Sequence, residues 1–154
     1  MSYTRKLVVL VASLGIAVTA MTAAAADLKS PDQIKTCLRI LMQVTNDFDR
    51  QITGQHYARL THENMEFMEG AQALRQALAN ESADLRAQVE PALQKAVDAA
   101  QHVADMSSTN DGDKLRAGHG EMLKAVNAVF AYFPEDLRPD PNVAPGRPPH
   151  PPSQ

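Results

Sequence analysis

The chain has 154 residues, a formal net charge of −3, one cysteine and no tryptophan. This length fits a single domain, and the acidic balance without basic clusters argues against nucleic acid as a partner. One cysteine excludes an intramolecular disulfide and any metal site built from several thiolates. We expect Cys37 to be buried, with pairing to a second copy in a homodimer as the alternative.

Residues 1–26 have the order of a cleavable secretory signal peptide. Arg5 and Lys6 precede an apolar run, and Ala24 and Ala26 fit a small-residue cleavage site. The run is shorter than the roughly 20 residues that a membrane-spanning helix needs. We therefore expect a periplasmic or secreted protein without a membrane span after cleavage, and an uncleaved anchor is the alternative.

Two helical segments come next, each with an apolar stripe at a spacing of three and four residues. The first, residues 31–54, starts with Pro31 behind Ser30 as the N-cap and ends at Gly54. The second covers residues 57–79. The two stripes are Ile34, Leu38, Leu41, Thr45, Phe48 and Ile52, and then Leu60, Asn64, Phe67, Ala71, Leu74 and Leu78.

Two further helices are predicted at residues 83–106 and from the end of a polar loop to Phe133. Pro91 should either kink the earlier of the two or mark its true start. Pro134 should stop the later one. Their stripes are Leu85, Val89, Ala92, Ala96, Ala99 and Val103, and then Leu115, His119, Met122, Val126, Val129, Phe130 and Phe133.

Four helices of similar length joined by short connections favour one architecture. We predict an all-α, antiparallel up-down-up-down four-helix bundle over residues 27–137. Residues 138–154 are rich in proline, and such a segment cannot bury a core, so we predict an extended or disordered tail.

His119 is the main candidate for chemistry. It falls on the apolar stripe of the last helix, one turn before Met122, where a histidine needs a hydrogen-bond partner. One hypothesis is a structural histidine bonded to a carbonyl, to Asn64 or to Thr45. The other is a ligand of a metal or of haem iron, with a methionine sulfur as second ligand.

Two neighbouring patterns bear on this choice. Gly118 and Gly120 flank His119 and either mark a late start of the helix or make room for a flat ligand. His62 and Met65 repeat the His-x-x-Met spacing on the second helix, which raises the possibility of a copper site between the two helices. A helical wheel places His62 opposite the apolar stripe, so we predict that it is solvated.

The remaining polar patterns do not predict an active site. Glu63, Glu66 and Glu69 are spaced by three on the second helix and are interpreted as a solvated polar face. The sequence contains no Ser-His-Asp set, nucleotide-binding loop or His-Glu-x-x-His motif. An enzyme is therefore the last of the functional hypotheses.

The layout resembles the cytochrome c-prime family and the related soluble b-type four-helix cytochromes. The resemblance rests on the first-helix stretch at residues 34–42, on the break at Gly54 and on the alanine-rich third helix. It implies an exported antiparallel four-helix bundle that carries haem for electron transfer or ligand binding, with a periplasmic redox partner.

The haem-attachment motif of that family is missing. The c-type members use Cys-x-x-Cys-His near the end of the last helix, where residues 124–133 contain neither cysteine nor histidine, so covalent haem c is excluded. The b-type relatives use a methionine early in the first helix, which Met42 approximates, and a histidine near the end of the last helix, where His119 lies too early to match. The alternative is a pairing of the two residues in the middle of the bundle.

These observations leave two functional hypotheses from different classes. In the first, non-covalent haem b or copper is held by His119 with Met42 or Met122, and a bare metal would use His119 and Met122. In the second, the protein is a haem-less periplasmic interaction module whose surface binds a protein partner. The colour of the purified protein would separate them.

Overall fold

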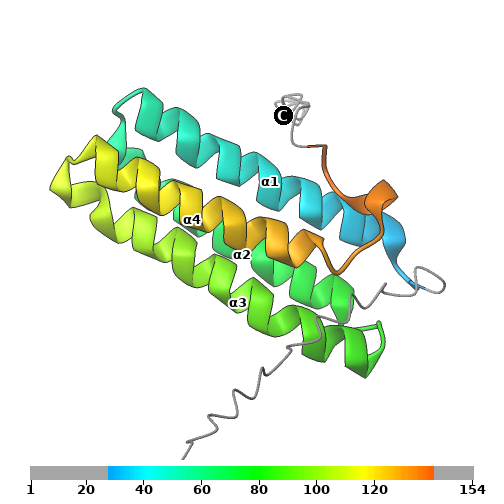
Figure 1. The fold of residues 1–154 in the computed structure, drawn as a ribbon. Helices are drawn as coiled ribbons and strands as arrows, with labels where there is room; N and C mark the ends of the chain where they lie inside the picture. The colour runs from blue at the N-terminus through cyan, green and yellow to red at the C-terminus, as the bar shows by residue number, and fades with distance from the viewer. Residues whose placement is uncertain (1–27, 141–154) are drawn as a thin grey trace, which may run out of the picture.

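The computed structural model describes residues 28–140 as helices joined by short connections (Figure 1). The four α-helices are α1 (Pro31–Thr53), α2 (Leu60–Leu78), α3 (Ala83–Asp105) and α4 (Gly112–Phe130). Short 3-10 turns are η1 (Tyr57–Arg59), η2 (Met106–Thr109) and η3 (Glu135–Leu137), and no strand occurs among the described residues. The predicted all-α fold is confirmed, whereas the predicted signal peptide and most of the predicted tail lie outside these residues.

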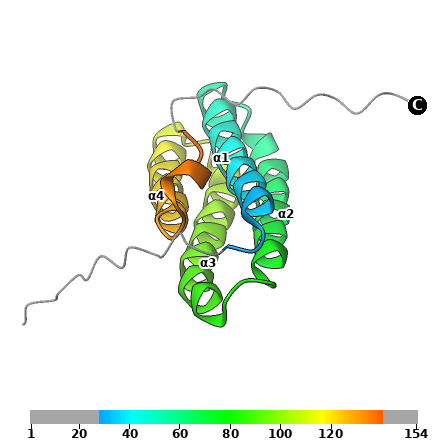
Figure 2. The same cartoon turned by 90° about the vertical axis from the view of Figure 1, so that its right-hand side faces the viewer.

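The helices form a four-helix bundle. Each short connection turns the chain back along the helix it has just left, so consecutive helices run in opposite directions (Figure 1). α1 packs on α2, α2 on α3, α3 on α4 and α4 on α1, as the nearly end-on view shows (Figure 2). Among the described residues, no helix is both long and apolar enough to cross a bilayer.

The core consists of the predicted apolar stripes. Every predicted stripe residue of α1 and α2 is buried, and in α3 buried positions alternate with half-buried ones. Burial of such stripes supplies most of the stability of a helical bundle, because isolated helices of this length are marginal in water. Cys37 is buried as well, in agreement with the prediction for a free thiol.

Polar side chains close the ends of two helices. The hydroxyl of Ser82 accepts a hydrogen bond from the backbone N–H of Leu85 at the start of α3. Oδ1 of Asp111 accepts from the N–H groups of Asp113 and Lys114 at the start of α4, and these bonds lower the pKa of that carboxyl.

The helix boundaries follow the prediction at Gly54 and differ from it at the end of α4. Gly54 caps α1 with φ of −77°, and the left-handed residue is the following one, Gln55, with φ of 59°. α3 continues through Pro91, which is exposed, so water can replace the hydrogen bond that its ring prevents. α4 ends at Phe130 rather than at Phe133.

The glycines beside His119 lie inside α4 rather than at its start. The hypothesis of a late helix start is therefore wrong. A Cβ added to Gly118 would lie 2.5 Å from Cε of Met106 and 3.3 Å from Cγ2 of Val103. Gly118 thus lets α4 approach the end of α3 closely, whereas a Cβ at Gly120 would meet nothing within 4 Å.

Candidate metal centre

His119 lies where α4 packs against α1. Its Nε2 is 2.9 Å from the backbone oxygen of Thr45, and its Nδ1 is 3.9 Å from Oδ1 of Asp49. The side chain is 13% exposed, which places it at the rim of the core. The structural hypothesis anticipated such a bond to a carbonyl, and this bond already engages one of the two ring nitrogens.

The two methionines considered as partners of His119 are core residues. Met42 and Met122 are both buried among apolar side chains. Three open pockets of about 340, 590 and 730 Å³ on the bundle are lined by other residues. The ligand set of His119, Met42 and Met122 therefore stays a prediction, and these three residues line none of the pockets.

A different group of polar side chains meets on the opposite side of α1. Asp47 of α1 and Glu63 and Glu66 of α2 each offer a carboxylate oxygen, and these oxygens lie within 4.8 Å of one another. We call these three residues the carboxylate cluster. The cluster lies between the antiparallel helices α1 and α2, so all three carboxylates are carried by residues of regular helices.

The members of the cluster differ in their partners. Asp47 pairs with Arg50, and Glu66 lies 3.2 Å from Nε2 of His62. Glu63 is only 5% exposed and forms no ion pair within residues 28–140. Its Oε1 accepts a hydrogen bond of 2.9 Å from Nε2 of Gln51, and its other oxygen accepts none from the described residues.

This environment disfavours negative charge. Burial raises the pKa of the Glu63 carboxyl and the hydrogen bond from Gln51 lowers it. The nearby Asp47 and Glu66 carboxylates raise this pKa, and the charge of His62 lowers it. Burial also raises the pKa of Asp47, and Arg50 opposes that shift. Arg50 and His62 offset part of the mutual repulsion of the three carboxylates, and a proton or a bound cation would reduce it further.

The sequence interpretation of this helix face was wrong for one residue. Glu69 is exposed as predicted, but Glu63 is buried against α1. Gly70, seven residues further along α2, explains the close approach, because a Cβ there would lie 3.1 Å from Cγ2 of Ile40. The spacing of seven residues puts Glu63 and Gly70 on one side of α2, but the sequence alone does not show that this side faces α1.

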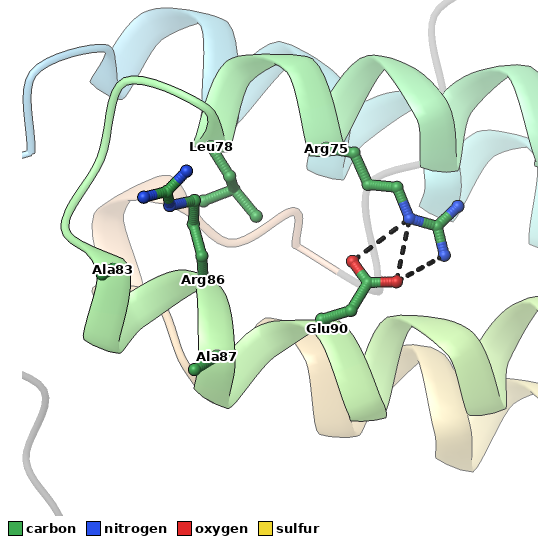
Figure 3. A pocket seen from close by; sticks show the side chains of 6 residues that line it. All are labelled: Arg75, Leu78, Ala83, Arg86, Ala87 and Glu90. Atoms are coloured by element: carbon green, nitrogen blue, oxygen red, sulfur yellow. Dashed lines mark hydrogen bonds and ion pairs between the residues drawn. The ribbon is translucent and has the colours of Figure 1, made fainter.

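The other side of α2 carries polar contacts of a different kind. A pocket of about 340 Å³ between α2 and α3 is lined by Arg75, Leu78, Arg86 and Glu90, among others (Figure 3). Nη2 of Arg75 lies 2.8 Å from Oε1 of Glu90, and the same guanidinium also donates to Gln94. This ion pair joins α2 to α3, and it balances one negative charge with one positive charge.

The chain matches no protein-family profile, and neither a curated protein nor a solved structure matches it. We therefore infer function from the chemistry of the described side chains. Among those side chains, the carboxylate cluster is a group of three acids close enough to hold one metal ion.

Proposed function

We propose that this protein binds a divalent cation at the carboxylate cluster, in a compartment outside the cytoplasm. The observation that supports the proposal is the environment of Glu63. Its side chain is largely buried, forms no ion pair among the described residues, and keeps one oxygen that no described group bonds and that is not fully enclosed. Buried carboxylates are normally paired with a cation or coordinate a metal.

The donor set selects a class of ion. Carboxylate oxygens are the ligands of hard divalent cations such as Mg²⁺, Ca²⁺ and Mn²⁺. Oxygens on opposite sides of such an ion lie about 4–5 Å apart. The 4.8 Å limit on the three oxygens fits that spacing without any change of the helix backbones.

The surroundings suit binding rather than catalysis. Glu63 would be a ligand held in place by Gln51, and Asp47 and Glu66 would complete the protein's contribution from the more open side. Water would supply the remaining ligands, as it does at most sites for these ions. The predicted signal peptide supports a binding site outside the cytoplasm. The haem hypothesis for His119 has weaker support, because one nitrogen of that ring bonds the backbone oxygen of Thr45.

Mn²⁺ is a suitable probe, because its electron paramagnetic resonance signal weakens when the ion leaves bulk water for a protein site. We expect the full chain to bind Mn²⁺ and Glu63→Gln to lose this binding. Gln at this position keeps the size of the side chain and the hydrogen bond from Gln51. Glu69→Gln removes an exposed carboxylate from the same helix and should bind Mn²⁺ like the unchanged protein.

Two results would contradict the proposal. The first is that the unchanged protein leaves the Mn²⁺ signal at its bulk intensity. The second is that Glu63→Gln and Glu69→Gln bind Mn²⁺ equally well. In the second case the ion would be held by general surface charge rather than by the buried carboxylate.

A further inference from the structure

The methionines of the four α-helices fall into two groups, whereas Met106 of η2 is half-buried. Met42 and Met122 are buried in the core, as methionine usually is in a helical bundle. Met65 and Met68 are 53% and 42% exposed on α2. Two exposed thioethers on one helix add little to the packing, and they present soft sulfur donors to solvent.

A histidine lies one turn before these methionines. The side chain of His62 is 69% exposed, and its Nε2 is 3.2 Å from Oε1 of Glu66. When Nε2–H donates to that carboxylate, the lone pair is on Nδ1, which is then free to bind a metal. Metal-binding histidines are usually oriented by a carboxylate on the other ring nitrogen, as His62 is by Glu66.

The spacing makes Met65 a surface neighbour of both His62 and Met68, which themselves lie about 120° apart around the helix. His62, Met65 and Met68 follow one another at intervals of three residues in the regular part of α2, and residues three apart on a helix are surface neighbours. Long side chains on a helix lean back toward its N-terminus. This direction favours placing the sulfur of Met65 over His62 and that of Met68 over Met65.

We propose that His62, Met65 and Met68 form a surface site for a soft monovalent cation, Cu(I). Thioether and imidazole donors select Cu(I) over the hard divalent ions that prefer carboxylates. The site would use Nδ1 of His62 with Sδ of Met65, and Met68 as a third donor. It does not depend on the carboxylate cluster, with which it shares only Glu66 as the residue that orients His62.

The test uses Ag⁺, a monovalent soft cation that stays in one oxidation state, in an isothermal titration of the full chain. Every protein in the test carries Cys37→Ala, because the only thiol of the chain would bind Ag⁺ by itself. We expect this background to bind Ag⁺ and the double variant Met65→Leu, Met68→Leu to lose the binding. His62→Ala should weaken binding, whereas His102→Ala, at an exposed histidine of α3, should not.

Glu66→Gln tests the orienting role of the carboxylate, since loss of such a partner costs about 10- to 100-fold in metal affinity. Glu63→Gln should leave Ag⁺ binding unchanged even if it removes Mn²⁺ binding, which separates this site from the carboxylate cluster. Unchanged Ag⁺ affinity in the double methionine variant would overturn the proposal. Equal loss in His62→Ala and His102→Ala would also overturn it, and far-ultraviolet circular dichroism would show that each variant is folded.

Discussion

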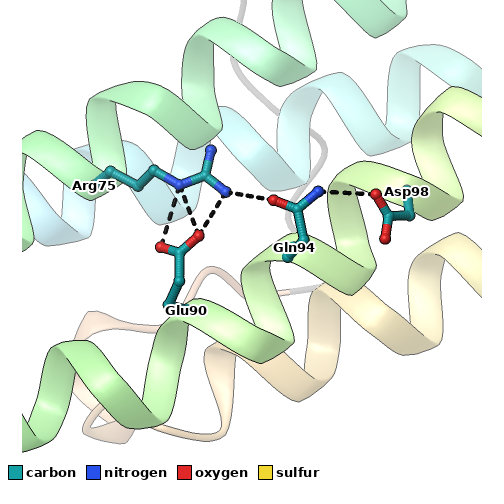
Figure 4. Close-up of polar contacts among 4 residues, drawn as sticks. All are labelled: Arg75, Glu90, Gln94 and Asp98. Carbon is teal, nitrogen blue, oxygen red and sulfur yellow. Dashed lines mark hydrogen bonds and ion pairs between the residues drawn. The ribbon is translucent and has the colours of Figure 1, made fainter.

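Helix α2 forms one polar interface with α3 and another with α1. The two interfaces differ in how the negative charge of a glutamate is balanced. Toward α3, Arg75 donates through Nε and Nη2 to Glu90 and through Nη2 to Gln94, whose amide in turn donates to Asp98 (Figure 4). A planar guanidinium with two donors on one carboxylate is a favourable ion-pair geometry. The charge in this interface is balanced by groups of the protein itself.

Toward α1, the same helix presents carboxylates whose negative charge is balanced much less by neighbouring groups of the protein. Glu63 is more buried than Glu90 and yet has an amide, Gln51, where Glu90 has the guanidinium of Arg75. The neutral amide of Gln51 donates to one oxygen of Glu63 but does not balance the negative charge of that carboxylate. The comparison suggests that the α2–α3 interface serves packing, whereas the α1–α2 interface is completed by a positive group from outside the chain.

The largest effect is expected when the α1–α2 interface receives a positive charge of its own. Gln51→Lys would place an ammonium beside Glu63, and a hydrogen bond to a charged group contributes about 1.5 kcal/mol to stability. We expect a higher free energy of unfolding in urea, with EDTA present, and a loss of Mn²⁺ binding. The lysine would occupy the place proposed for the cation.

The matched control for this change is Gln76→Lys. Gln76 lies on α2 and is exposed, so its replacement adds the same charge away from the cluster. It should leave both stability and Mn²⁺ affinity close to their original values. A Gln51→Lys protein that is less stable than the Gln76→Lys protein would show that Glu63 does not need a positive partner.

A smaller effect is expected from the reverse change in the α2–α3 interface. Arg75→Gln removes the guanidinium and leaves Glu90 without a positive partner. Because this pair is partly exposed, the free energy of unfolding should fall by about 0.5–1 kcal/mol. Urea unfolding measures the change, and added Mn²⁺ should not restore the loss, since Glu90 belongs to no carboxylate cluster among the described residues. Restoration by Mn²⁺ would mean that any unpaired glutamate of this bundle binds the ion.

The helices and the core could be predicted from the sequence because they depend on local spacing. The stripe from Ile34 to Ile52 is buried at every predicted position, and the start of α1 at Pro31 was also expected. Such patterns need no knowledge of which helix lies opposite. The solvation of His62 could be predicted for the same reason, because it lies far from the centre of its stripe.

The candidate metal centre could not be predicted, because it depends on which flank of α2 faces α1. Glu63 lies at the edge of its stripe, where a wheel alone does not distinguish a solvated position from one covered by a neighbour. Asp47 and Gln51 come from another helix, and their meeting with Glu63 depends on the packing of α1 against α2. Gly70 allows that close packing, but its role becomes visible only when Ile40 is placed beside it.

The smallest expected effect is a difference in how stability depends on pH. Without metal, the pKa values of Glu63 and Asp47 are raised in the folded protein, mainly by burial. The folded state therefore holds protons that the unfolded state has already released. The stability that these two groups contribute is present below their ordinary carboxyl pKa, near 4, and is lost as pH rises through their raised values.

Glu63→Gln removes one of the two carboxyl groups that bind a proton more tightly in the folded state. The variant and the unchanged protein should have similar stability at low pH, and the variant should become the more stable of the two as pH rises toward neutrality in EDTA. Urea unfolding over this range measures the difference, and Glu69→Gln should show no such divergence because its carboxylate is exposed. Saturating Mn²⁺ should reverse the order at neutral pH, because an ion that binds only the folded state stabilises it by mass action and the variant lacks the ligand. A difference in the free energy of unfolding that stays constant at every pH would contradict this prediction, because it would mean that folding does not raise the pKa of Glu63.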